Sequence, residues 1–537
     1  MRQRRLMGAM LAVALLLVTS LPVLVAAQEG DRPVLRFGVN AADVAALDPH
    51  QATGTQDRTV VDMIFNGLIR FVPGNSAELE PDLAEAIPEP TMDGDQQVWT
   101  FTLRDDVMCH PGPDSEAYPL TAEDVVYSFE KAADPDRSAL AGDYAGITVA
   151  AADERTVTFT LDTPLSPTLF LPKVANYAGG FIVCAQAAEA MGDEAFRTNP
   201  VGTGPFMFES YTPQTAVNLV ANDDYFRGAP LLGGVEVRYM PDTSSRELGL
   251  QSGELDAAAG LQEAQWVDRI NAEGNLQADV FGVGEAAFFN FNVTVEPFDD
   301  PLVRQAIAYA ISRENHQALY GAPVAENIYS VVPAELIPGG LTQEEAAAAD
   351  VAYEQDLDRA RELLAEAGYA DGFTVDLITS EMSAYRANYE VLQAELAEIG
   401  ITVNLNVVDH ATMHAQIREN VNPITLYVAF RPNADAYLTQ FFYSPSIVGE
   451  GESPITNFAH YAEIDDLIEQ ARVETDPDAQ AELWRQANTQ ILEDMAAMPL
   501  HYQNQVYART QNVDYGHELI SSLALYPQIT ELTTINP

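Results

Sequence analysis

A strand followed by a helix, in residues 286–333, constrains the fold of this sequence more than any other segment. The run FFNFN, which begins at Phe288, alternates apolar and amide side chains and predicts a strand with one strongly apolar face. Asp300 suits the N-cap of a helix, and Pro301 suits its first turn, because no hydrogen bond is lost there. Apolar residues continue at helical spacing, and Gly321 is expected to end the helix. The segment therefore predicts a core unit of an α/β domain.

The length and the charge of the chain limit the remaining possibilities. A chain of 537 residues is too long for one compact core, so at least two domains are expected. The formal net charge of −53 repels nucleic acids and anionic membranes, and we expect neither as a partner. The total charge does not define the ligand, because the charge of a pocket can differ from that of the whole surface.

The amino terminus has the pattern of a targeting segment. A basic start, an apolar stretch and the small residues Ala26 and Ala27 predict a signal peptide over residues 1–27. An uncleaved membrane anchor is the alternative, since the apolar stretch is nearly long enough to span a bilayer. The mature protein is expected to be exported, to the periplasm or the outer face of the membrane.

Several short blocks of sequence match one protein family in residue type, order and spacing. They are FFNFN followed by PFDDPLVRQAIAYAISRE and VVP, then WTFTLRDDV, PLTAEDVVYSFE and NPVGTGPF. With these blocks the sequence resembles the bacterial extracellular solute-binding proteins of the dipeptide, oligopeptide and nickel class (family 5). These proteins are the receptors of ABC importers, and the resemblance covers about residues 34–510.

The resemblance implies an α/β fold of the two-lobed periplasmic-binding-protein type II, with an extra hairpin-rich subdomain inserted in lobe 1. The expected segments are lobe 1 at 34–75 and 199–285, the inserted subdomain at 76–198, lobe 2 at 286–498, and a return to lobe 1 at 499–537. The glycines of the NPVGTGPF block are interpreted as a tight return into the lobe 1 sheet. A phosphate-binding loop is rejected there, because no lysine follows and no helix begins.

The function implied by the resemblance is capture rather than catalysis. A peptide or similar small organic solute binds between hinged lobes and is delivered to the permease subunits of an ABC transporter. A monomer without a cofactor and without enzymatic activity is expected.

The ligand-contacting residues are predicted from the family's pattern. Relatives often carry a tryptophan and then an acidic residue, which holds a peptide amino group, in a loop rich in aspartate and proline. Here Tyr427 takes the aromatic place, and Phe430 stands where the acid is usual, although Asp435 could substitute. Arg431 offers a positive group for a carboxylate or phosphate. Arg386 matches a carboxylate-binding position of some dipeptide receptors, or else is an exposed helix residue. The candidates are Tyr427, Phe430, Arg431, Asn433, Asp435 and Arg386.

Two other hypotheses stay open at this point. His410 and His414, four residues apart, could share a helix face and hold a divalent ion, which would make the protein a nickel or metal-chelate receptor. A solvated helix face explains the same two histidines. A secreted hydrolase with clustered carboxylates is the third hypothesis, although no hydrolase motif is found.

Cys109 and Cys184 are the only cysteines in the chain. Outside the cytoplasm such a pair forms either a disulfide, which would close a loop of about 75 residues, or two separate buried thiols. The sequence leaves this choice open.

Overall fold

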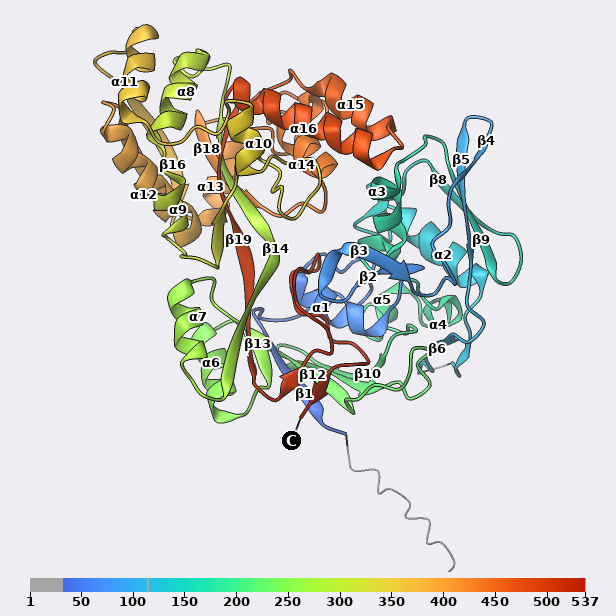
Figure 1. Ribbon diagram of the computed structural model, residues 1–537. Coiled ribbons are helices and arrows are strands. Elements are labelled where there is room, and N and C mark those ends of the chain that lie inside the picture. The colour runs from blue at the N-terminus through green and yellow to red at the C-terminus, as the bar shows by residue number, and fades with distance from the viewer. Residues whose placement is uncertain (1–31, 114, 537) are drawn as a thin grey trace, which may run out of the picture.

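The computed structural model describes residues 32–113 and 115–536, so the expected signal peptide (1–27) lies outside the described residues. Within these ranges, no helix combines the length and the apolar character that a bilayer crossing requires. Two lobes are joined by two long neighbouring strands, β14 (Leu276–Phe291) and β19 (Ala497–Thr510), as Figure 1 shows. We call β14 and β19 the hinge strands.

A nine-stranded sheet runs through both lobes. Its strand order is β10-β11-β12-β1-β13-β19-β14-β18, and β15 also pairs with β19. The remaining bounds are β1 (Val34–Val39), β10 (Phe206–Thr212), β11 (Ala216–Ala221), β12 (Gly234–Tyr239), β13 (Ala257–Ala259), β15 (Ala325–Asn327) and β18 (Ile424–Ala429). Strands β12, β1 and β13 are parallel, so their carboxyl ends meet at one edge of the sheet. The hinge strands are antiparallel to each other.

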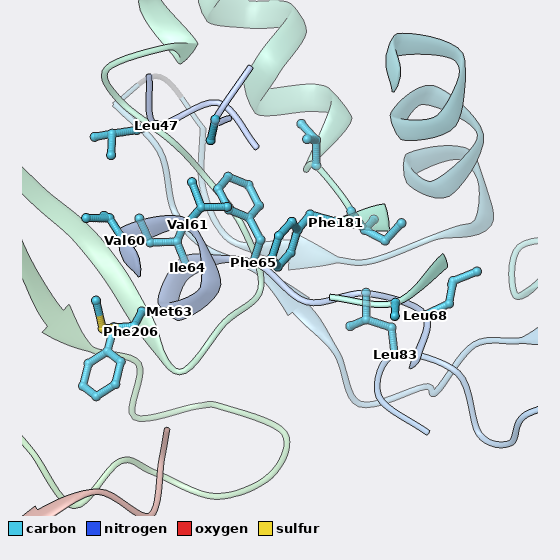
Figure 2. Packing of buried hydrophobic residues seen from close by; sticks show 14 of the residues in the cluster. Leu47, Val60, Val61, Met63, Ile64, Phe65, Leu68, Leu83, Phe181 and Phe206 are labelled. Carbon is cyan, nitrogen blue, oxygen red and sulfur yellow. The ribbon is translucent and has the colours of Figure 1, made fainter. Parts of the chain in front are cut away.

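The first lobe contains the helices α1 (Thr55–Ile64), α6 (Thr243–Ser252) and α7 (Ala264–Asn271) and the hairpin of β2 (Ile69–Val72) and β3 (Asn75–Pro81). Apolar residues of α1 point into a core in which Phe65 meets Phe181 at 6.4 Å between ring centroids (Figure 2). An added Cβ at Gly202 would lie 2.2 Å from the Ile64 carbonyl oxygen. The glycines of the NPVGTGPF block therefore permit a close backbone approach to α1 and do not form a phosphate loop.

A four-stranded antiparallel sheet and several short helices extend the first lobe on one side. The strands are β4 (Thr91–Asp93), β5 (Gln96–Thr102), β9 (Thr156–Leu161) and β8 (Ile147–Ala151), in that order. Helix α2 (Ala122–Ala133) begins with a capping box, in which Thr121 and Asp124 satisfy each other's backbone N–H groups. These elements lie in residues 76–198, the segment that we propose as the inserted subdomain. Their apolar side chains belong to the same core cluster as those of the first lobe.

Two buried links hold this region together. Cys109 in β6 (Met108–Cys109) is bonded to Cys184, which precedes α4 (Ala185–Met191), so the structure contains the disulfide that the sequence left open. Lys131 of α2 forms an ion pair with Asp48, and both side chains are fully buried. Because a buried charge without a partner is costly, this pair fixes the loop that precedes α1 against α2.

The second lobe contains a parallel crossover unit and two groups of helices. Strands β16 (Thr374–Ser380) and β17 (Thr402–Val408) pair in parallel, and α12 (Ser383–Ala397) connects them. The other helices are α8 (Pro301–Ala310), α9 (Arg313–Gln317), α10 (Gln343–Ala348), α11 (Leu357–Glu366), α13 (His410–Arg418), α14 (Ala434–Phe442), α15 (Asp465–Val473) and α16 (Pro477–Glu493).

The helix after the apolar strand begins as predicted but ends earlier. The Asp300 side chain accepts a hydrogen bond from the Leu302 N–H at 2.9 Å and caps α8. The expectation that one helix continues to Gly321 is wrong, because α8 ends at Ala310 and α9 starts afresh. The Ser312 hydroxyl accepts from the Asn315 N–H at 3.3 Å and caps α9, which breaks the helix at this point.

Candidate functional site: the cavities between the lobes

A cavity of about 650 Å³ lies between the two lobes, against the hinge strands. We call it the hinge cavity. The first lobe lines it with the carboxyl ends of β1 and β13 and with the start of α1. The second lobe contributes the residues that follow α9 and the first turns of α12. In open α/β sheets the carboxyl ends of parallel strands are where ligands bind, so the position of this cavity is that of a ligand site.

Two polar side chains of the hinge strands line the hinge cavity side by side. Glu285 of β14 lies directly opposite Gln503 of β19 in the ladder, and directly opposed residues of antiparallel strands share one face. An added Cβ at Gly284 would lie 2.0 Å from the Gln503 carbonyl oxygen, so the two backbones approach closely just before this pair. The close approach fixes the position from which Glu285 enters the cavity.

Glu285 is an acid that forms no ion pair among the described residues. It is half-buried, and burial raises the pKa of its carboxyl, an effect that the positive charge of Arg431 partly offsets. Among the described residues, no arginine, lysine or histidine lies within ion-pair distance of this carboxylate. The site can therefore accept a positive charge from a ligand.

Gln503 presents a weakly satisfied donor. It is 3% exposed, and its Nε2 makes no hydrogen bond of good geometry among the described residues, although it lies close enough to the Tyr320 hydroxyl to lower the pKa of that group against the effect of burial. Its neighbour Tyr320 donates its hydroxyl to the Ala384 carbonyl at 3.3 Å and accepts from Asn388 at 3.3 Å. Since buried polar groups are normally hydrogen-bonded, Gln503 is a second side chain of this cavity that can donate to a ligand.

A second cavity, of about 470 Å³, lies between the four-stranded region and the second lobe. We call it the side cavity. Asn433 and Asp435 line it, opposite Lys173 of the first lobe. The Asp435 carboxylate pairs with Arg472 at 3.1 Å, while burial raises the pKa of Asp435 against this attraction. Burial also lowers the pKa of Lys173. Asp435 is thus already neutralised by the protein.

The other predicted residues of this loop lie outside the lining of both cavities. Tyr427 of β18 lies among aromatic rings, 5.5 Å from Phe441 between centroids. Arg431 donates to Gln440 Oε1 at 2.5 Å and to the Phe430 carbonyl at 2.7 Å, and its guanidinium lies 5.1 Å from the centre of the Phe441 ring. Contact of Tyr427, Phe430 and Arg431 with a ligand stays a prediction.

Arg386 and the histidine pair are also separate from the hinge cavity. Arg386 lies on α12 beside cavity-lining residues, but it is half-exposed and donates to Glu390 Oε1 at 2.7 Å. The Nε2 atoms of His410 and His414 are 3.2 Å apart, so the two histidines do share one face. Burial lowers the pKa of His414, and the positive charges of His410 and of Arg418, which lies 3.3 Å away, add to this effect. Within residues 32–113 and 115–536, no group of three or more His, Cys, Asp or Glu side chains could hold a metal ion.

The sequence interpretation missed Glu285, Gln503 and Tyr320. One signal was available for Glu285: it is the only charged residue between Asp279 and Glu296, in a strand that continues into the apolar FFNFN run. Burial of a carboxylate in such a strand costs stability unless the carboxylate has a partner, so an acid at this position is a candidate for a functional residue. Gln503 carries no such signal, because its importance depends on lying opposite Glu285.

Two lobes that share two hinge strands and enclose a cavity lined from both sides define a two-lobed solute-binding protein. Residues 78–448 match the family described as bacterial extracellular solute-binding proteins, family 5 middle. The chain belongs to this family, which confirms the family and the two-lobed α/β fold expected from the sequence, while the inserted subdomain stays a prediction.

Individual relatives bind several kinds of solute. The di/tripeptide-binding protein 2 of Pseudomonas aeruginosa is 28% identical over 483 residues, which cover 84% of this chain and 86% of that protein. The solved structure of MoaA from A. tumefaciens R10 in complex with mannopinic acid is 39% identical, with a TM-score of 0.76, and the match covers 94% of this chain and 100% of that one. The periplasmic binding protein DppA from Helicobacter pylori in complex with the peptide STSA is 25% identical, with a TM-score of 0.72 and coverage of 94% and 98%.

Proposed function

We propose that this protein is the receptor of an ABC importer and captures a peptide or similar small organic solute in the hinge cavity. The observation that carries the proposal is that both lobes and both hinge strands line one cavity of about 650 Å³, a volume typical of small-molecule sites. A relative named for di/tripeptides and two solved structures in complex with mannopinic acid and with a peptide support this solute class.

The mechanism is closure around the solute. A solute that contacts α1 on one side and α12 on the other gains contacts when the lobes approach each other, and so shifts the equilibrium toward the closed form. The closed receptor then docks on the membrane permease and releases the solute unchanged. Export by the signal peptide, action as a monomer in the periplasm or at the outer face of the membrane, and the absence of a cofactor are parts of this proposal.

The test is to identify the solute and to measure closure. Protein purified without denaturation is analysed by mass spectrometry for a co-purified small molecule. Small-angle scattering is then recorded on the stripped protein, with and without that molecule and a panel of di- and tripeptides and mannopinic acid. A smaller radius of gyration with one of these solutes is expected. Scattering that stays the same with every solute, together with no co-purified molecule, would refute the proposal.

The two alternatives have less support. A nickel-chelate receptor needs ligands beyond His410 and His414, and the adjacent Arg418 repels a cation. Calorimetry with nickel–histidine that gives no metal-dependent heat with the wild type would end that hypothesis, and equal heat for the wild type and an H410A/H414A variant would exclude the two histidines as the ligands. A hydrolase is tested by incubating the solute panel with the protein, because recovery of intact solutes excludes this activity.

A further inference from the structure

The pair of Glu285 and Gln503 has the chemistry of a recognition site for one particular head group. The carboxylate of Glu285 offers acceptors and a negative charge, and Nε2 of Gln503 offers a donor. Because the two residues are directly opposed on antiparallel strands, their Cβ atoms are about 4.5–5.5 Å apart. A ligand that satisfies both side chains needs a charged donor next to an acceptor.

Other ligand classes fit this pair less well. An inorganic anion or an isolated carboxylate would be repelled by Glu285, which has no arginine or lysine partner within ion-pair distance among the described residues. A divalent metal ion would find one carboxylate where no cluster of three metal-binding side chains exists in the described residues. A neutral sugar could donate hydroxyl hydrogen bonds to the carboxylate, but it would supply no positive charge, so it would stabilise the half-buried Glu285 less than a cation does.

An amino-acid head group supplies both features. Its protonated amine donates up to three hydrogen bonds. Its carboxylate or carbonyl oxygen lies two covalent bonds from the nitrogen-bearing carbon, so Gln503 can reach this oxygen while Glu285 holds the amine. We propose that Glu285 and Gln503 form the head-group site of the receptor, in which Glu285 accepts from a protonated amine of the solute and Gln503 donates to the adjacent carboxylate or carbonyl oxygen. This inference rests on the proposed function, since it assigns the solute class of the same cavity.

The other acid considered for an amino group does not compete for this role. Asp435 lines the side cavity and is paired with Arg472 at 3.1 Å. A cation bound there would have to displace an existing buried partner, whereas a cation at Glu285 gains one. The hinge cavity is therefore the place where an amine is stabilised most.

The experiment compares solutes that differ only in the amine. Calorimetry on the stripped full-length mature protein uses the pairs Ala-Ala with N-acetyl-Ala-Ala, and L-glutamate with N-acetyl-L-glutamate, together with any co-purified solute. The two pairs distinguish a peptide amine from a free amino-acid amine. The variants are Glu285→Gln, Gln503→Leu and, as a matched control, Glu335→Gln. Glu335 also has a pKa that burial raises, but it lies outside the lining of both cavities.

We expect at least one solute with a free amine to bind and its N-acetylated form not to bind. Loss of a buried ionic partner weakens binding strongly, so Glu285→Gln should lower the affinity by about 30-fold or more. Gln503→Leu should lower it about 10-fold, and Glu335→Gln should leave it unchanged. An unliganded melting temperature of Glu285→Gln equal to or above that of the wild type shows that the affinity loss is not misfolding.

Two outcomes overturn the inference. If an N-acetylated solute binds as tightly as its free amine, or if Glu285→Gln binds as tightly as the wild type, the head-group assignment fails while the receptor function stands. If no solute of the panel binds to the wild type and none co-purifies, the receptor function fails and the head-group site fails with it.

Discussion

Removal of the Cys109–Cys184 disulfide is expected to destabilise the first lobe by about 4.5 kcal/mol. The two cysteines are 75 residues apart in the chain. In the chain-entropy description, closing a loop of that length removes about 15 cal/mol/K from the unfolded state, which is about 4.5 kcal/mol at 298 K. Both cysteines are fully buried, so their replacement by alanine also leaves two small packing defects that act in the same direction.

The assay is calorimetry of the unliganded wild type and of a Cys109→Ala, Cys184→Ala double variant. If the proposed first lobe (34–285 and 499–537, about 290 residues) unfolds as one unit, its unfolding entropy is about 0.6 kcal/mol/K near the melting temperature. A loss of 4.5 kcal/mol then corresponds to about 7 °C. Reduction of the wild type should reproduce the shift, and the same reductant should not affect the double variant. A shift below about 2 °C would refute the loop-entropy reasoning.

Three further predictions concern titratable side chains in buried or half-buried positions. Lys131→Met should cost on the order of 3–5 kcal/mol, because it leaves Asp48 buried without its cation, and adding Asp48→Asn should restore most of that loss in urea denaturation. Burial lowers the pKa of His50 and His110 to about 4 and of His501 to about 3, so the unfolding free energy should fall as the pH drops below 6.5. Each of the three histidines should lower the free energy of unfolding by on the order of 2 kcal/mol at pH 5 relative to pH 7. An unchanged melting temperature between pH 7 and pH 5 would contradict this. Burial raises the pKa of Glu285 above 4.5, so its ionisation destabilises the unliganded fold as the pH rises. Glu285→Gln should therefore melt higher than the wild type at pH 7 and equally below pH 4.5, and equal melting at pH 7 would argue against it.

The elements of the fold could be predicted because their signals are local. Asp300 caps α8 and Thr121 caps α2 through hydrogen bonds that span at most three residues. The end of α8 could not be predicted from Gly321 alone. Ser312 offers a new cap within the apolar pattern, and that cap competes with continuation of the helix.

The ligand site could not be predicted in the same way, because it depends on strand register and on distant partners. Asp435 looked like a free acid in the sequence, yet Arg472, 37 residues later, neutralises it. Glu285 is left without an ion-pair partner, and Gln503 lies opposite it on the other hinge strand, far away in the sequence. No pattern within one segment shows which acid keeps a partner and which does not.

The position of Glu285 and Gln503 on the hinge strands also links recognition to motion. Because β14 and β19 run through both lobes, a head group held by this pair contacts a part of the cavity that is present before the lobes move. The contacts from α1 and α12 are the ones that closure adds, since these helices belong to opposite lobes. A solute that keeps the head group but lacks the remainder should therefore bind weakly without shifting the equilibrium, because a ligand promotes closure only through contacts that the closed form makes better. Scattering on the complex with a bare amino acid, compared with the full solute, separates these two contributions. Equal compaction by both would mean that the hinge pair itself drives closure.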